Sequence, residues 1–177
     1  MKNLRGFSLI ELLVLMAIIA ILATIAVPNF SATIKGDRDI SQINTLLDGL
    51  TLARSEAIHN GNNVTICPGN NNACSAANWA NGWIVFYDTL PPGATTSTIR
   101  VFPGLSGNNT LTAAPAATSI TFQSSGQTTL ATGVMFTLCD TRGRDYGRSI
   151  NLTITGSAET AARVGYEVDG VTPLPGC

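Results

Sequence analysis

One carboxylate, Glu11, interrupts an otherwise apolar stretch near the start of the chain. The stretch from Phe7 to Phe30 contains no other charged residue. A carboxylate at the centre of a membrane-spanning helix costs about 2.5–3.5 kcal/mol, so such a group is normally paired with a positive charge or has a function. The alternative is that Glu11, close to the start of the stretch, reaches the interface and has no specific role. The chemistry that suits it best is ion pairing at low dielectric.

Sulfur chemistry is the second candidate, because the chain contains four cysteines, Cys67, Cys74, Cys139 and Cys177. An even number in an oxidising compartment indicates two disulfides, for which three pairings are open. We prefer Cys67 with Cys74, which closes a tight loop, and Cys139 with Cys177, which fixes the C-terminus to a strand. Zinc binding is the alternative, but there is no C-x-x-C pair and the lone His59 falls in a helical pattern. We therefore expect no metal.

Three arginines, Arg142, Arg144 and Arg148, are spaced closely enough to act as a candidate DNA-binding cluster. However, Asp140 and Asp145 lie among them, and the whole chain has a formal net charge of −1. Three arginines contact two or three phosphates, whereas committed duplex binders contact about six to ten. We favour a structural role in a turn and do not expect a nucleic-acid partner.

The sequence offers little for catalysis. It has one histidine, no Gly-x-Ser-x-Gly elbow, no carboxylate pair at a telling spacing and no glycine-rich phosphate loop. Charged residues make up 12% of the chain, about half of the usual ~25%. The composition indicates a packed domain that is not an enzyme and needs no cofactor.

The element that must position Glu11 is a long helix. As a helix, residues 7–30 reach about 36 Å, enough to cross a hydrocarbon core of ~30 Å. The leader, residues 1–6, carries Lys2 and Arg5, which places the N-terminus in the cytoplasm. A cleaved signal peptide is the alternative, but residues 23–27 offer only weak cleavage sites.

We expect this helix to continue past Pro28, with a kink, as far as Asn60. Apolar residues recur at three- and four-residue steps up to Gly61, which predicts one buried face. That stripe comprises Ile34, Ile40, Ile43, Leu47, Leu50, Ala53, Ala57 and Ile58.

Beyond Gly61 the pattern changes to short β segments in a globular domain, residues 61–177. Seven strands are predicted, and residues 106–118 are expected to form a surface loop. The fold class is therefore α+β, with the long helix packed on an antiparallel sheet. The predicted strands are 64–66, 83–87, 98–102, 119–122, 134–138, 149–154 and 164–168.

The string from Gly6 to Glu11, between a basic leader and an apolar helix, closely resembles the type III signal of type IV pilins and pseudopilins. The resemblance implies that a prepilin peptidase cuts after Gly6 and methylates Phe7. It also implies that Glu11 pairs with the N-terminal amine of a neighbouring subunit in a filament. Both groups are costly alone at low dielectric and compensate each other as a pair.

Further segments resemble the FimT/FimU/GspH group of minor pilins and pseudopilins, namely residues 52–57, 64–68 and 81–88, and residues 138–148 are similar to the FimU branch. The resemblance implies a subunit that helps to initiate or cap a type IV pilus. Its partners would be the prepilin peptidase and other major and minor pilins. It would sit in the inner membrane with a periplasmic domain and then in the fibre.

Two alternatives stay open within that resemblance. A type II secretion pseudopilin shares the signal, the helix and the sheet, and the physics of these residues does not separate it from a pilus subunit. The DNA-binding minor pilins of natural transformation carry a Gly-Arg-x-Arg motif, where this chain has residues 156–163 with one acid and one arginine.

Overall fold

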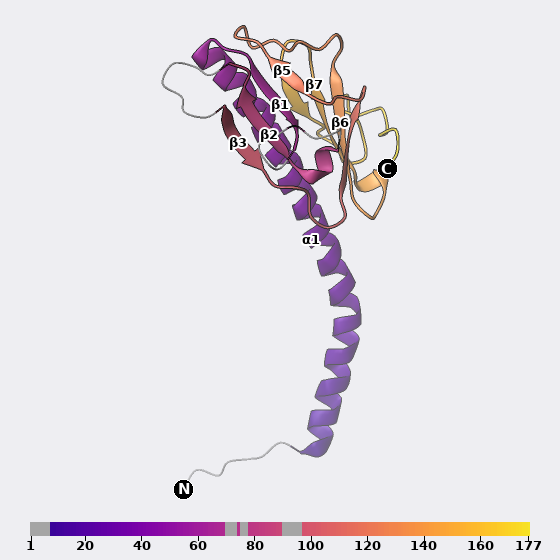
Figure 1. Ribbon diagram of the computed structural model, residues 1–177. Coiled ribbons are helices and arrows are strands. Elements are labelled where there is room, and N and C mark those ends of the chain that lie inside the picture. The colour runs from indigo at the N-terminus through magenta and orange to yellow at the C-terminus, as the bar shows by residue number, and fades with distance from the viewer. Residues whose placement is uncertain (1–7, 70–73, 75–77, 90–96) are drawn as a thin grey trace. The chain divides into compact units, whose positions relative to one another are not determined.

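The computed structural model describes residues 8–69, 74, 78–89 and 97–177 (Figure 1). The long helix is α1, Leu9–Asn60, with 52 residues. It continues through Pro28 as predicted, and it ends where expected, because Gly61 adopts a positive φ of 67° that an L side chain rarely adopts. The chain divides into two compact units, residues 1–37 and residues 38–177.

The first unit contains the start of α1. Across the described part of the chain, no helix combines the length and apolarity that would class it as a membrane span. The crossing by residues 7–30 is therefore not confirmed and stays a prediction.

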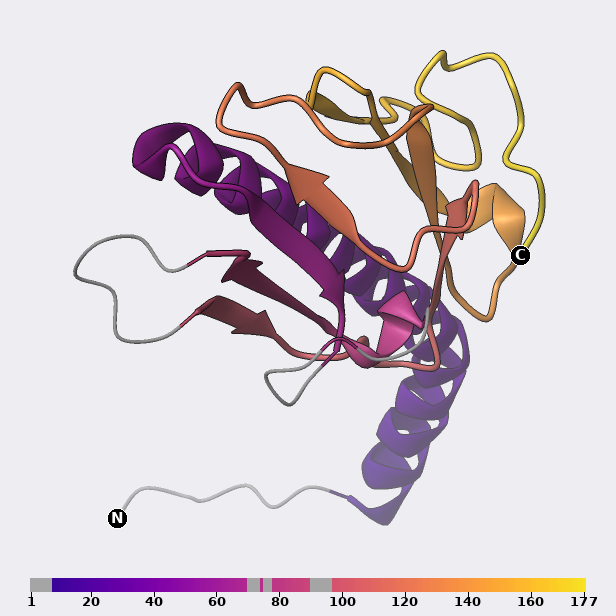
Figure 2. The same cartoon turned by 45° about the horizontal axis from the view of Figure 1, so that its top comes forward.

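The second unit places the end of α1 against two four-stranded antiparallel sheets (Figures 1 and 2). The predicted α+β class, with the long helix packed on antiparallel β-structure, is confirmed, and the strands form two sheets. The first sheet has the order β3-β2-β1-β5, with β1 Val64–Pro68, β2 Trp83–Tyr87, β3 Thr98–Phe102 and β5 Ile120–Phe122. The second has the order β4-β6-β7-β8, with β4 Thr110–Ala114, β6 Val134–Cys139, β7 Arg148–Leu152 and β8 Ala158–Thr160.

Three of the local predictions are wrong. The predicted loop over residues 106–118 contains β4, which pairs with β6 along its whole length. Strand β8, which pairs with β7, is absent from the predicted strands. The strand predicted over 164–168 does not form, because Gly165 has a φ of 79°, outside the extended region. Only an isolated bridge joins Tyr166 to Pro173 there.

One core joins the helix to both sheets. Its helical part is a stripe of buried residues, Ile43, Leu46, Leu50, Ala53 and Ala57. The predicted stripe is correct in its middle and wrong at its ends, since Ile34, Ile40 and Ile58 are 41–52% exposed. The stripe instead begins at Asp39, which is buried with 1% exposure and lies four residues before Ile43.

Two tryptophans fill the space between the elements. Trp79, in the 3-10 helix Trp79–Asn81, meets Phe136 of β6 edge-on at 5.0 Å and donates its indole N–H to Ala117 O at 2.9 Å. Trp83 of β2 stacks on Phe102 of β3 at 5.6 Å. The first contact packs the 3-10 helix against the second sheet, and the second packs β2 against β3 within the first sheet.

Both preferred disulfides are confirmed. Cys67 at the end of β1 is bonded to Cys74, and Cys139 at the end of β6 is bonded to Cys177, each pair with Cα atoms 5.6 Å apart. The second bridge fixes the C-terminus of the chain to the second sheet, as predicted from the sequence.

Gly49 supplies a test of this packing. A Cβ built on Gly49 would lie 2.7 Å from the Trp83 indole nitrogen and 3.3 Å from Ile66 Cδ1. Overpacking a dense core costs about 1–3 kcal/mol, which exceeds the ~1 kcal/mol that alanine gains over glycine in a helix. We expect Gly49→Ala to lower the free energy of unfolding by about 1–2 kcal/mol, measured by urea denaturation of the full chain in detergent.

Gly36→Ala is the matched control, because no atom lies within 4 Å of a Cβ built there. It should be neutral or slightly stabilising. Equal stability of the two variants would contradict the packing of α1 on β2.

Candidate functional site

The N-terminal candidate site is a capping box at the start of α1. The Ser8 backbone N–H donates to Glu11 Oε2 at 3.2 Å, and the Glu11 N–H donates to Ser8 Oγ at 3.3 Å. These reciprocal bonds satisfy two donors that the first helical turn otherwise leaves free. The predicted processing residues Gly6 and Phe7 lie outside the described residues.

The Glu11 carboxylate therefore has a local partner that the sequence analysis does not predict. The spacing Ser-x-x-Glu before an apolar run is the signal that indicates it. At this position the positive end of the helix dipole also favours a negative charge. The second oxygen, Oε1, receives no hydrogen bond from the described residues, so the carboxylate has capacity to bind one more donor.

The surface around Glu11 is apolar and uncovered. The large apolar side chains from Leu9 to Leu22 are 52–79% exposed. A continuous exposed surface of this kind marks an interaction site with protein or membrane. A charged group near the start of this surface then gives it a directional contact.

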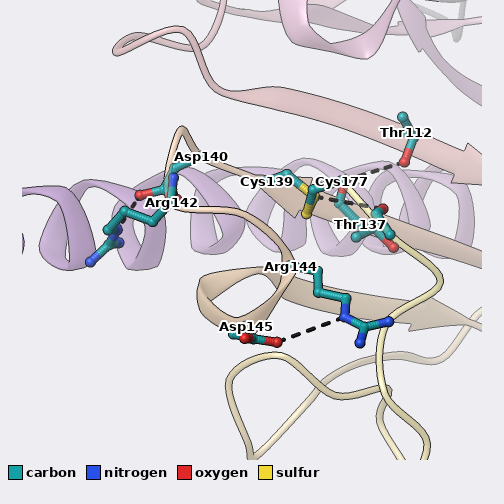
Figure 3. The surroundings of a disulfide bond; sticks show 9 residues. Thr112, Thr137, Cys139, Asp140, Arg142, Arg144, Asp145 and Cys177 are labelled. Atoms are coloured by element: carbon teal, nitrogen blue, oxygen red, sulfur yellow. Dashed lines mark hydrogen bonds and ion pairs between the residues drawn. A yellow bond between two sulfur atoms is a disulfide. The ribbon is translucent and has the colours of Figure 1, made fainter.

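The second candidate site is the loop between β6 and β7, where Arg142 is held by two carboxylates. Figure 3 shows one of them, Asp140, beside Arg142. Its Nη2 atom lies 2.8 Å from Asp39 Oδ2 on α1, and its Nε donates to Asp140 Oδ2. The Arg142 backbone N–H also donates to Asp140 Oδ1 at 2.8 Å. The guanidinium is stacked on the Tyr146 ring at 4.4 Å. Arg142 thus joins α1 to this loop.

Asp39 is the buried member of this network. Besides Arg142, it accepts a 2.7 Å hydrogen bond from Asn109 Nδ2, and Asn109 also donates to Gln42 Oε1 at 2.6 Å. Burial raises the pKa of the Asp39 carboxyl, and the bonds from Asn109 and Arg142 oppose that change. Burial lowers the pKa of Arg142, but the bonds to Asp140 and Asp39 outweigh it, so the pKa of the guanidinium lies above its usual value.

The other two arginines have different surroundings. Arg144 Nε lies 3.7 Å from Asp145 Oδ1, and both side chains are more than half exposed. Figure 3 shows Arg142 and Arg144 pointing in different directions from the loop. Arg148 is at the start of β7, where its Nε atom is buried and has no hydrogen-bond partner among the described residues. The three side chains that are close in sequence therefore do not share one environment.

Metal ligands do not cluster in the described parts of the chain: no three His, Cys, Asp or Glu side chains come together in a way that would hold an ion. The two sites contain one carboxylate in an apolar surface and one arginine in a structural network. Neither has a nucleophile beside a base among the residues that the structure describes.

Two solved structures share this fold. Both are crystal forms of the type IV minor pilin FimU of Pseudomonas aeruginosa. One matches with a TM-score of 0.55 and 22% identity over 73% of this chain and 90% of that chain. The other matches with a TM-score of 0.50 and 23% identity over 63% of this chain and 82% of that chain. The pilin-like fold is therefore shown.

A curated relative matches over a short segment. The type IV wide pilus major component PilA4 of Thermus thermophilus is 54% identical over 39 residues. That segment is 22% of this chain and 30% of the relative, so the chain matches less than a third of PilA4.

Two family models match the chain directly. The prokaryotic N-terminal methylation motif matches residues 1–27, a range that includes Gly6, Phe7 and Glu11. The model described as type II transport protein GspH matches residues 42–158, more than half of the chain. The chain belongs to the GspH family, within the type IV pilins and pseudopilins, which are structural proteins rather than enzymes.

Proposed function

We propose that this protein is a minor pilin that helps to initiate or cap assembly of a type IV pilus. One observation carries the proposal: the large apolar side chains from Leu9 to Leu22, which surround a single carboxylate, are 52–79% exposed. Exposure of such an apolar surface to water is unfavourable, whereas a bilayer or a bundle of similar helices would bury it. A helix that is first held in the membrane and later packed on other helices in a fibre would have its apolar surface buried in both situations.

The role of Glu11 in assembly follows from its hydrogen bonding. One carboxylate oxygen caps the helix through Ser8, and the other accepts nothing from the described residues. The amine created by cleavage after Gly6 on an incoming subunit is a donor of opposite charge. At low dielectric the two charges attract strongly, which fixes the axial position of the new helix.

The proposed location follows from the same helix. Residues 7–30 would cross the inner membrane, with the domain 61–177 in the periplasm, before the subunit enters the fibre. The two disulfides support an oxidising compartment for that domain.

A type II secretion pseudopilin is the second candidate, favoured by the description of the family model that matches residues 42–158. Deletion of the gene distinguishes the two roles. Loss of surface pili and twitching with normal secretion supports the pilus role, and loss of secretion with normal pili supports the pseudopilin role. The neighbouring genes give an independent answer.

DNA binding by Arg142, Arg144 and Arg148 is the third candidate function, and we do not favour it. Arg142 is already bound to Asp39 and Asp140, and the remaining two arginines have different surroundings. Affinity for duplex depends on many neutralised phosphates, so we expect no micromolar binding at physiological salt.

Processing provides the first test. In wild type, the N-terminal peptide should begin at a methylated Phe7, which mass spectrometry identifies. Gly6→Leu should retain Met1, because the side chain obstructs the approach of the peptidase to the backbone. A wild-type protein that retains Met1, or that is cut after Ala26, contradicts the proposal.

Substitution of Glu11 separates its two roles. Glu11→Gln keeps an amide oxygen that can cap the helix but removes the charge, so incorporation into pili should fall roughly tenfold or more, since the pair is worth more than ~1.4 kcal/mol. Ser8→Ala is the matched control: it removes part of the cap, worth about 0.5–2 kcal/mol, and keeps the charge. Quantitative immunoblots of sheared pili measure both. If Glu11→Gln assembles like wild type, ion pairing is not the role of Glu11.

The structural role of Arg142 is tested by stability. Arg142→Gln removes the positive charge that faces the buried Asp39 carboxylate. Removing one member of a buried pair costs about 3–5 kcal/mol, and partial exposure of Arg142 reduces this to about 2–3 kcal/mol. Arg144→Gln, at an exposed site, should change the free energy of unfolding by less than ~0.5 kcal/mol. Urea denaturation compares the two, and similar values would contradict the network.

A further inference from the structure

A surface pocket of about 430 Å³ lies between the β6–β7 loop and the C-terminal segment. Two of its lining residues are arginines, Arg144 and Arg163, from parts of the sequence that the domain brings together. The remaining lining residues are Asp145, Val164, Gly165, Tyr166 and Pro173. None of them takes part in the assembly site at Glu11.

The wall of this pocket is fixed by backbone bonds. The Gly165 N–H donates to Gly147 O at 2.8 Å, and the Leu174 N–H donates to Gly165 O at 3.0 Å. Ser149 Oγ donates to Tyr166 O at 3.1 Å. A Cβ at Gly165 would lie 2.9 Å from Asp145 O, so glycine permits the close approach. The pocket is therefore formed before any ligand arrives, which reduces the entropic cost of binding.

The two guanidinium groups of the pocket have unused donors. Arg163 stacks on the Tyr166 ring at 3.8 Å and forms no hydrogen bond or ion pair with the described residues. Among the described residues Arg144 forms one ion pair, with Asp145 at 3.7 Å between exposed side chains. Stacking orients the guanidinium plane and leaves its N–H groups free for a planar, bidentate acceptor.

We propose that this pocket binds a carboxylate side chain of a neighbouring polypeptide in the fibre. The proposal rests on the proposed function, since the fibre supplies the neighbour. A carboxylate matches the guanidinium fork in shape and charge. The exposed Val164 and Pro173 add apolar contact. Arginine and tyrosine are among the residue types enriched at the positions that contribute most to binding energy in protein interfaces.

The local charge favours a single carboxylate over a polyphosphate chain. Asp145 is part of the pocket, and Glu167 and Asp169, which follow Tyr166 closely in the sequence, line a second pocket. These acidic side chains would repel a nucleic-acid strand, because its many phosphates need a row of cations to bind. A lone acidic side chain needs only the two arginines, and it is placed by the apolar residues beside them.

A titration tests the pocket without depending on a fibre. The probes are a capped Ala-Glu-Leu tripeptide, its Ala-Gln-Leu analogue and a short oligothymidine, each added to the full chain in detergent up to about 10 mM, well into the range of weak binding. Arginine Nε–H resonances are followed by NMR. We expect only the glutamate peptide to shift the signals of Arg144 and Arg163, and Arg144→Gln with Arg163→Gln should abolish the effect. No shift by the glutamate peptide, or an equal shift by the glutamine peptide or the oligothymidine, overturns the proposal.

Assembly gives the second measurement. Arg144→Glu with Arg163→Glu should lower incorporation into pili roughly tenfold through like-charge repulsion, while cleavage after Gly6 and thermal unfolding remain as in wild type. Arg100→Glu, at an exposed site on β3, is the matched control and should assemble normally.

Normal assembly of the double variant overturns the proposal even where the peptide binds. If wild type is absent from pili, the proposed function fails, and the peptide titration still decides whether the pocket binds carboxylate.

Discussion

The ion pair between Asp39 and Arg142 determines where α1 becomes part of the domain core. Within the second unit, Asp39 is the first buried residue of the helix, and its partner lies 103 positions later in the chain. Placing a carboxylate in a core is unfavourable unless it is paired and hydrogen-bonded, and here Arg142 and Asn109 both satisfy it. Because a shifted helix would leave this charge unpaired, the pair specifies one register of α1 on the second sheet.

Sequence patterns predict this fold where apolar residues recur with one clear period, as in the long helix. They fail where the burial of a residue depends on partners that are distant in the sequence. The helix from Leu9 to Asn60 and its end before Gly61 are predictable from apolar spacing and one glycine. The start of the buried stripe is not predictable in this way, because Asp39 is acidic and a search for apolar residues passes over it. Its position nevertheless continues the three- and four-residue spacing of the buried residues that follow it. Strand β4 escapes prediction because threonine and alanine give weak alternation, although Leu111 is buried. Such errors arise because partners distant in sequence decide burial.

Glu11 shows why a site can be identified from sequence while its geometry is not. An isolated carboxylate in an apolar stretch is a clear signal, because its burial is costly. The signal contains nothing about its partner. In the structure that partner is the Ser8 N–H of the same helix, which stabilises the charge when the subunit is alone. Under the proposed function, a subunit that joins others would use the second carboxylate oxygen without first losing the helix cap, so storage and assembly would not compete for the same contact.

The disulfide between Cys139 and Cys177 connects the structural role of Arg142 with the proposed binding role of Arg144 and Arg163. It closes a loop with a sequence separation of 38 that contains Arg142, Arg144, Arg148 and Arg163. In the chain-entropy model a loop of this size stabilises the folded state by about 3–4 kcal/mol. A sequence window treats Arg142, Arg144 and Arg148 as one positive cluster. The folded loop instead pairs Arg142 with carboxylates, one of them on α1, and leaves Arg163 stacked on an aromatic ring with donors to spare, because each arginine meets a different part of the domain.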